Sequence, residues 1–221
     1  MQQLFPREGE TTPRLRFPEF RDAGPWEVKR LGEVATRVTE QVGSKKLTPV
    51  SITASCGFVP QTTKFGRDIS GKQYAKYIRL RRGQFAYNKG NSKSYPQGAV
   101  YQLLEFPEAA APNVFYCFQF KEGYFPEFYK GYFKLNFHGS QLEKFITSGA
   151  RSNGLLNIRA DDFFSIILPT PREKAEQQEI ADCLSSLDDL IRAQSERIEA
   201  LKQHKKGLMQ QLFPSLDEVR G

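Results

Sequence analysis

The fold is decided by residues 170–214, which read TPREKAEQQEIADCLSSLDDLIRAQSERIEALKQHKKGLMQQLFP. No proline interrupts this segment between Pro171 and Pro214. Thr170, Pro171 and Glu173 match the N-cap, N1 and N3 positions of a capping box, which marks the start of a helix. The segment therefore predicts one continuous helix over 170–214.

Apolar residues recur along this helix at alternating spacings of four and three, which is the heptad pattern of a coiled coil. Gln194 and Lys205 interrupt that seam. A helix of about 40 residues is roughly 60 Å long, which exceeds the diameter of a domain of this size. The helix is expected to project and to bury its seam against a partner helix rather than against its own domain. The expected helix-pairing residues are Ile180, Leu184, Leu187, Ile191, Ile198, Leu201, Leu208 and Leu212.

The hexapeptide MQQLFP occurs twice, at residues 1–6 and again at 209–214. Such identity indicates one unit of a longer repeating pattern, with residues 1–6 as the tail of a preceding unit. Residues 7–25 are rich in proline and charge, which predicts a linker. The expected organisation is a linker and tail at 1–25, a globular domain at 26–169, the long helix at 170–214 and a short tail at 215–221.

The globular part predicts short strands mixed with short helices. The strand pattern favours 48–52, 84–88, 99–104, 114–120 and a closing strand within 162–168. Helices are expected at 126–134 and 140–147. The fold class is therefore predicted to be α+β, a globular mixed-strand domain followed by a long coiled-coil helix.

The charge of the chain is concentrated in one segment. The net charge is +7 with a pI near 9.3, which favours a polyanionic partner. Between residues 64 and 93 nine basic residues face only Asp68, so this segment carries all of the excess. Such a cluster can displace counterions from phosphates and bind nucleic acid, although a solvated strand face remains the alternative. Its members are Lys64, Arg67, Lys72, Lys76, Arg79, Arg81, Arg82, Lys89 and Lys93.

Two polar segments carry side chains suited to reading bases. Residues 87–98 (YNKGNSKSYPQG) supply Asn and Gln for adenine edges, Lys for guanine and Ser for either. Residues 148–154 (SGARSNG) have the same character, with a plain turn as an equal alternative. The candidate DNA-binding residues of these loops are Tyr87, Asn88, Lys89, Asn91, Ser92, Lys93, Ser94 and Tyr95 in the first, and Arg151, Ser152 and Asn153 in the second.

Catalytic and metal signatures are weak. Cys56, Cys117 and Cys183 form no CxxC pair, so a zinc site is not expected, and their odd, sparse number fits a reducing compartment. His138 and His204 form no metal pair. No nucleophile elbow or methyltransferase motif occurs, and no apolar run is long enough to span a bilayer. The chain is expected to be cytoplasmic and non-catalytic, with no cofactor or metal of its own.

Four segments, in order, resemble the specificity subunits of type I restriction–modification enzymes. They are residues 26–35 (WEVKRLGEVA), 82–91 (RGQFAYNKGN), 149–153 (GARSN) and the helical region from 177–181 (QQEIA) to 207–214 (GLMQQLFP). The helical region is the most specific of the four.

The resemblance implies a DNA recognition subunit. Members of that family carry two target recognition domains separated by two long helices that pair antiparallel. Each domain reads one half of a split double-stranded DNA target, and the helices dock methyltransferase subunits, which recruit motor-nuclease subunits. S-adenosylmethionine, ATP and magnesium would then belong to the partners. This chain has one recognition domain and one full helix, so it resembles half of such a subunit, and a natural half is expected to form a homodimer through the helix.

Two other functions stay open. A stand-alone binder of RNA or single-stranded DNA would stack bases on the aromatic residues that interleave with the basic ones. Those residues are Tyr74, Tyr77, Phe85 and Tyr87. A coiled-coil adaptor without nucleic acid would use the long helix alone.

Overall fold

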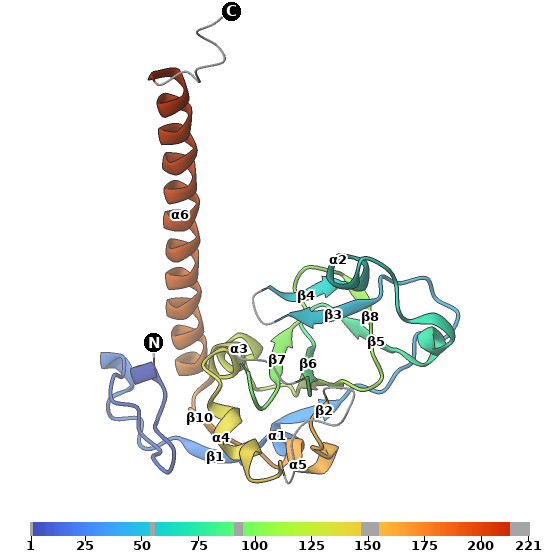
Figure 1. Cartoon of the computed structure of the whole chain (residues 1–221). Helices are drawn as coiled ribbons and strands as arrows, with labels where there is room; N and C mark the ends of the chain where they lie inside the picture. Colours follow the sequence, from blue (N-terminus) through green and yellow to red (C-terminus); the bar gives the residue numbers. More distant parts are fainter. Residues whose placement is uncertain (1, 54–55, 91–94, 147–154, 213–221) are drawn as a thin grey trace, which may run out of the picture. The chain divides into compact units, whose positions relative to one another are not determined.

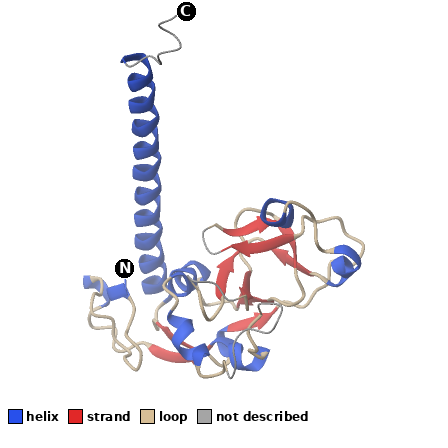
Figure 2. Ribbon diagram, in the orientation of Figure 1, coloured by secondary structure: helices blue, strands red, loops and turns tan. Residues whose placement is uncertain are grey.

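The computed structural model describes residues 2–53, 56–90, 95–146 and 155–212. The chain divides into two compact units, Met1–Ile180 and Ala181–Gly221. Strands and helices are mixed throughout the first unit, whereas the described part of the second is a single helix (Figure 2). The α+β class and the long C-terminal helix are confirmed.

The first unit is built from short antiparallel strands and short helices (Figure 1). Its described strands are β1 (Glu27–Arg30), β2 (Ala35–Arg37), β3 (Val50–Thr53), β4 (Gly57–Pro60), β5 (Ile78–Arg81), β6 (Phe85–Asn88), β7 (Ala99–Gln102), β8 (Glu108–Ala111), β9 (Tyr116–Phe120) and β10 (Ile167–Thr170). Its described helices are α1 (Leu31–Val34), α2 (Gln61–Phe65), α3 (Pro126–Lys134), α4 (Phe137–Glu143), α5 (Ala160–Phe164) and 3-10 turns at Gln2–Leu4, Pro18–Phe20 and Gly71–Lys76. The central sheet has the order β2-β9-β6-β7, and β1-β10, β3-β4 and β5-β8 form two-stranded sheets.

Aromatic side chains fill the core beside the central sheet. Phe85 on β6 faces Phe118 on β9, and their rings stack with centroids 5.3 Å apart. Both side chains are fully buried, as is Phe133 on α3, which contacts the two rings. β6 lies between β9 and β7 in the central sheet, and its first three residues, Phe85 to Tyr87, are buried.

The start of the chain differs from the prediction that residues 1–6 are only the tail of a preceding unit. Leu4 and Phe5 are only 5% and 1% exposed, and the Phe5 ring lies 6.4 Å from that of Trp26 and 5.3 Å from that of Phe128. The first unit therefore begins with residues 1–6 rather than at residue 26, because burial of Leu4 and Phe5 removes a large apolar area from water.

The start of α6 (Lys174–Leu212) also differs from the prediction. Thr170 ends β10, pairs with Glu27 of β1, and its hydroxyl donates to the carbonyl of Leu168 at 3.0 Å. The predicted capping box is therefore wrong, since Thr170 is held in a strand.

The first turns of α6 belong to the first unit and are anchored there by buried polar side chains. Glu176 accepts hydrogen bonds from Arg16 at 2.7 and 2.8 Å and from the indole nitrogen of Trp26 at 3.0 Å. The Gln177 side chain accepts from the backbone N–H of Phe125 at 2.9 Å. These bonds join the helix to residues distant in the sequence, which a helix cap would not do.

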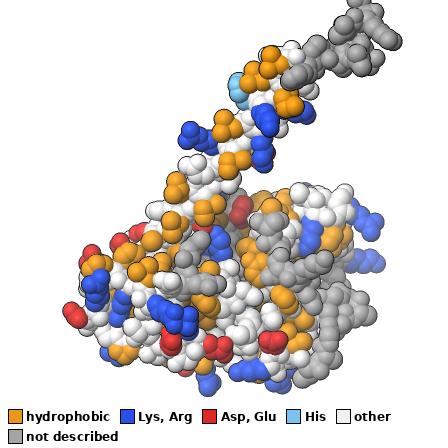
Figure 3. Space-filling model, turned by 60° about the vertical axis from the view of Figure 1, so that its left-hand side comes forward, with side chains coloured by type: hydrophobic (Ala, Val, Ile, Leu, Met, Phe, Trp, Pro, Cys, Tyr) orange, Lys and Arg blue, Asp and Glu red, His pale blue; other side chains and the backbone are white. Residues whose placement is uncertain are grey.

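The second unit presents most of the predicted seam. Ile180 and Leu184 are buried, at 2% and 7% exposed, and the six later seam residues are exposed. Figure 3 shows hydrophobic side chains along this helix, interspersed with lysines and arginines. Those exposed residues are Leu187, Ile191, Ile198, Leu201, Leu208 and Leu212.

Two predicted elements are displaced. The helix expected at 140–147 is α4 (Phe137–Glu143), which Asn136 introduces in the left-handed conformation at φ 58°. The strand expected within 162–168 is α5 followed by β10. In both places the helices are short, seven residues in α4 and five in α5, so the helical period of the sequence is not expressed over enough residues to be recognised.

Candidate nucleic-acid interface

The ends of the two predicted reading loops meet. Gly90 and Leu155 form an antiparallel β-bridge. The N–H of Leu156 donates to the carbonyl of Lys89 at 2.9 Å. Lys89 and Gly90 of the polar segment 87–98 are therefore joined to Leu155 and Leu156, which directly follow the segment 148–154 in the sequence.

Lys89 stands at this junction. Its Nζ donates to the hydroxyl of Tyr116 at 3.1 Å and lies 4.7 Å from the centre of that ring. The Tyr116 hydroxyl in turn donates to the carbonyl of Ile158 at 2.8 Å. Because an ammonium group has three donors, this contact positions Lys89 and leaves it able to bind an additional acceptor.

A tight turn shapes the first loop. The Asn88 side-chain oxygen accepts the N–H of Gly90 at 2.9 Å. Gly98 adopts φ +83°, and a Cβ there would lie 2.6 Å from the carbonyl oxygen of Asn88. Only glycine fits at residue 98, so the return of the loop to β7 depends on it.

Tyr87 differs from its predicted role. Its side chain is fully buried, stacks on Phe163 with centroids 4.3 Å apart, and donates from its hydroxyl to the carbonyl of Gln97 at 2.6 Å. Burial raises the pKa of this phenol. Tyr87 therefore supports the loop from inside the core and does not face a ligand.

A cavity of about 440 Å³ borders the loop junction. Its lining includes Lys64 on α2 together with Asn88, Gly90 and Leu155. The amino group of Lys64 donates to the carbonyl of Ile52 at 2.8 Å, and partial burial of this group lowers its pKa. Lys64, a predicted phosphate contact, thus lines the same cavity as Asn88 and Gly90 of the first polar segment.

The cavity also contains amide side chains that the sequence did not single out. Gln73 and Asn113 line it. Gln73 lies within the basic segment but carries no charge, and Asn113 lies outside the basic segment and both polar segments, so no local pattern marked either residue. Their position beside Asn88 comes from the packing of separate elements.

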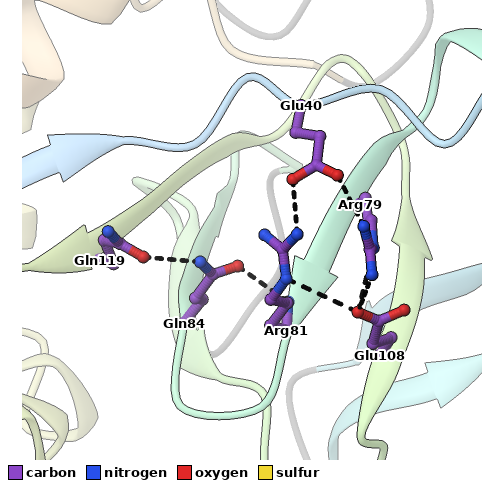
Figure 4. A network of polar contacts seen from close by, with 6 residues as sticks. All are labelled: Glu40, Arg79, Arg81, Gln84, Glu108 and Gln119. Carbon is purple, nitrogen blue, oxygen red and sulfur yellow. Dashed lines mark hydrogen bonds and ion pairs between the residues drawn. The ribbon is translucent and has the colours of Figure 1, made fainter.

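Two members of the basic cluster are neutralised. On β5, Arg79 pairs with Glu108 and lies 2.7 Å from Glu40, and Arg81 lies 2.7 Å from Glu40 and 3.6 Å from Glu108 (Figure 4). The hydrogen bond from Arg79 holds the pKa of Glu108 below its ordinary value. The same network lowers the pKa of Glu40. The expectation that only Asp68 opposes the basic residues is therefore wrong, because carboxylates outside the segment fold onto it.

The network continues through amides. The Gln84 side chain accepts the backbone N–H of Arg81 at 2.8 Å and donates to Gln119 at 2.7 Å (Figure 4). These bonds fix the edge of the β5-β8 sheet relative to the central sheet. Arg79 and Arg81 thus act as structural residues.

The other basic residues of the segment keep their charge exposed. They have no ion pair within the described ranges of the chain and lie on or next to the Gly71–Lys76 turn, α2 and β5. These residues are Arg67, Lys72, Lys76 and Arg82.

Several of the residues predicted to contact bases lie outside the described residues. Tyr95, which is described, is half-buried, and its ring centroid lies 6.2 Å from that of Tyr101. The readers outside the described ranges are Asn91, Ser92, Lys93, Ser94, Arg151, Ser152 and Asn153. In the part of the chain that the structure describes, no His, Cys, Asp or Glu residues gather as a metal site. No helix there has the length and hydropathy needed to cross a bilayer.

The chain matches known proteins over most of its length. Residues 24–203 match the model of the type I restriction modification DNA specificity domain. The specificity subunit of the type I restriction enzyme MjaVIII from Methanocaldococcus jannaschii is 37% identical over 71 residues, which are 32% of this chain and 16% of that protein.

Solved structures share the fold. The S subunit of a type I restriction–modification system from M. genitalium superposes with a TM-score of 0.50 and 13% identity, over 90% of this chain and 48% of that one. A chain from a structure on complex assembly and conformational transition of the type I R-M system gives a TM-score of 0.50 and 16% identity, over 91% and 48%. The chain thus spans about half the length of these structural relatives.

Proposed function

Because this chain belongs to the type I restriction modification DNA specificity family, we propose that it recognises one half of a bipartite sequence in double-stranded DNA. It performs no chemistry itself. The observation that carries this proposal is the Gly90–Leu155 bridge, which joins the first polar segment to the residue directly after the second. Sequence recognition needs several donors and acceptors that converge on neighbouring base edges.

The roles divide between base reading and phosphate binding. The amide, hydroxyl and amino groups of 88–95 and 151–153 read base edges in the major groove. Lys64 and the exposed Arg67, Lys72, Lys76 and Arg82 bind phosphates, which supplies salt-sensitive affinity. Tyr87, Arg79 and Arg81 hold the scaffold, which is supported by their burial and ion pairs.

The partners are assigned by the same proposal. The exposed seam of α6 pairs with a second long helix, either that of another copy in a homodimer or that of a second half of a longer subunit. Methyltransferase subunits dock on this helical region and recruit motor-nuclease subunits. S-adenosylmethionine, ATP and magnesium belong to those partners. The complex works in the cytoplasm, in keeping with the free thiols of Cys117 and Cys183.

A selection experiment tests the proposal. The full chain is incubated with duplexes of random sequence at two salt concentrations, and the retained duplexes are sequenced. We expect one short motif to be enriched, and Asn91→Ala and Asn153→Ala to relax single positions of it. Gln203→Ala on α6 is the matched control and leaves the motif unchanged. Retention without any enriched motif contradicts sequence recognition.

The single-strand alternative has less support. Phe85 and Tyr87 are fully buried, and Tyr77 is 6% exposed. The Tyr74 hydroxyl accepts from the N–H of Leu47 at 2.6 Å. Base stacking needs exposed ring faces, so these aromatics favour a core role. Competition between duplex and single strands in the same assay separates the two functions.

A further inference from the structure

The repeated hexapeptide has a structural role at its first occurrence. In residues 1–6, a 3-10 turn over Gln2–Leu4 leads into Phe5 and Pro6. Leu4 and Phe5 are 5% and 1% exposed, and Pro6 is also buried. The hexapeptide therefore inserts its Leu-Phe-Pro end into the first unit.

The receiving pocket is aromatic and comes from distant parts of the sequence. Besides Trp26 and Phe128, the Phe5 ring contacts Tyr132 at 6.0 Å and Phe137 at 5.6 Å between centroids. Trp26 is fixed by its hydrogen bond to Glu176. Four rings thus enclose Phe5: one directly before β1, two on α3 and one on α4. Such an enclosure favours an aromatic ring over other side chains.

The pocket is open beyond the phenylalanine. A cavity of about 330 Å³ begins at Pro6 and continues between Tyr132, Phe137 and Ile167. Residues that follow a Leu-Phe-Pro end can therefore leave the pocket without crossing the core.

The second occurrence of the hexapeptide, at 209–214, presents the same apolar residues to solvent where it is described. Met209 is 51% exposed and Leu212 is 71% exposed at the end of α6. A helical turn precedes the Phe-Pro pair here as it does at Gln2–Leu4. Identical side chains after a similar turn are expected to make the same contacts in the same pocket.

We propose that the pocket around Phe5 is a receptor for the MQQLFP hexapeptide, and that it accepts residues 209–214 of a second copy of this chain. The two hexapeptides are identical in sequence and are expected to make the same contacts, so tethering decides between them. The N-terminal copy has an effective concentration in the millimolar range at its own pocket because a short chain connects them. The 209–214 copy enters when residues 1–6 are withdrawn, as in exchange of an identical element between protomers.

The single tryptophan of the chain provides the reporter. A peptide of residues 205–218 is titrated into the full chain carrying Phe5→Ala, and the emission of Trp26 is recorded. We expect saturable binding, with a peptide carrying Phe213→Ala binding at least about ten-fold more weakly because it lacks the ring that the pocket selects. In the unmodified chain Phe5 fills the pocket. This chain is therefore expected to bind the peptide at least about ten-fold more weakly than the Phe5→Ala chain does. Equal responses to the peptide and its alanine version overturn the proposal.

A second variant guards against loss of folding. Phe5→Leu retains an apolar side chain in the pocket, so the variant is expected to fold while residues 1–6 bind the pocket more weakly. The 205–218 peptide then raises its melting temperature and the alanine peptide does not. If neither Phe5 variant gains stability from the peptide, the pocket is not a receptor for the second hexapeptide.

Discussion

The backbone N–H of Leu156 donates a hydrogen bond to the carbonyl of Lys89 at 2.9 Å. Lys89 follows strand β6, and Leu156 follows the polar segment 148–154. This bond and the adjacent Gly90–Leu155 bridge join the described residues that border the two polar segments. The predictions below test what those loops and their surroundings do.

The first prediction concerns the junction lysine. Lys89→Ala combined with Lys93→Ala is expected to weaken duplex binding and to reduce the slope of log affinity against log salt by about two, because each lysine held against DNA in the groove releases nearly one counterion. Binding is measured by fluorescence anisotropy between low and moderate salt. Lys206→Ala, on the exposed face of α6, is the control that leaves the slope unchanged. An unchanged slope in the double variant places the interface elsewhere.

The second prediction separates free from paired arginines. Arg82→Ala is expected to lower the salt slope by about one. Arg79→Ala is expected to leave the slope unchanged and to lower the melting temperature, because its guanidinium already pairs with Glu40 and Glu108. The two variants remove the same charge, so they control for each other. Equal salt slopes in the two contradict the assignment of Arg79 to the scaffold.

The third prediction concerns the anchor of α6. Glu176 is 1% exposed in its side chain and pairs with Arg16, which is 8% exposed. Glu176→Gln leaves Arg16 buried without its counter-charge and is expected to destabilise the fold by about 3 kcal/mol. Urea unfolding followed by Trp26 fluorescence measures the change. The matched variant Glu173→Gln alters an exposed residue of the same segment and is expected to change stability little.

The fourth prediction concerns pH. His138 is fully buried against Tyr87 and Phe133, and burial lowers its pKa to about 4 from an ordinary 6.5. Between these values the unfolded chain binds the proton and the folded chain does not, so stability falls as pH drops. The expected loss is about 1.4 kcal/mol per pH unit within this window. Above pH 6.5 the histidine contributes no pH dependence.

The control for this prediction is a variant that cannot take up the proton. His138→Phe is expected to flatten the stability curve between pH 6.5 and 4, measured by urea unfolding at several pH values. If the free energy of unfolding of His138→Phe falls with pH as steeply as that of the unmodified chain, other groups cause the acid sensitivity.

The fifth prediction concerns the exposed seam. Ile198→Asp with Leu201→Asp is expected to abolish helix pairing, because charged residues at seam positions cannot be desolvated. Sedimentation equilibrium of the full chain over a range of concentrations measures the association. Gln203→Asp lies away from the seam and is the control. If the variant and the control associate equally, the seam does not form the interface.

The tertiary structure decided which predicted residues are available for binding. Arg79 and Lys72 look alike in the sequence, yet Arg79 is neutralised because strand pairing and a loop bring Glu108 and Glu40 to it. Tyr87 was predicted to read DNA, but stacking with Phe163 buries it. Both outcomes depend on residues distant in the chain, which a local pattern does not report.

The sequence by itself determined the long helix, its heptad seam, the net positive segment and the polar loops. Each of these is a local property, since helical period, charge and turn composition act over a few neighbouring residues. It also revealed the repeated hexapeptide, although not that Phe5 is part of the core. Only the tertiary structure joined Lys89 to Leu156 and placed Phe5 among four rings, because contacts between distant residues exist only once the chain has closed on itself.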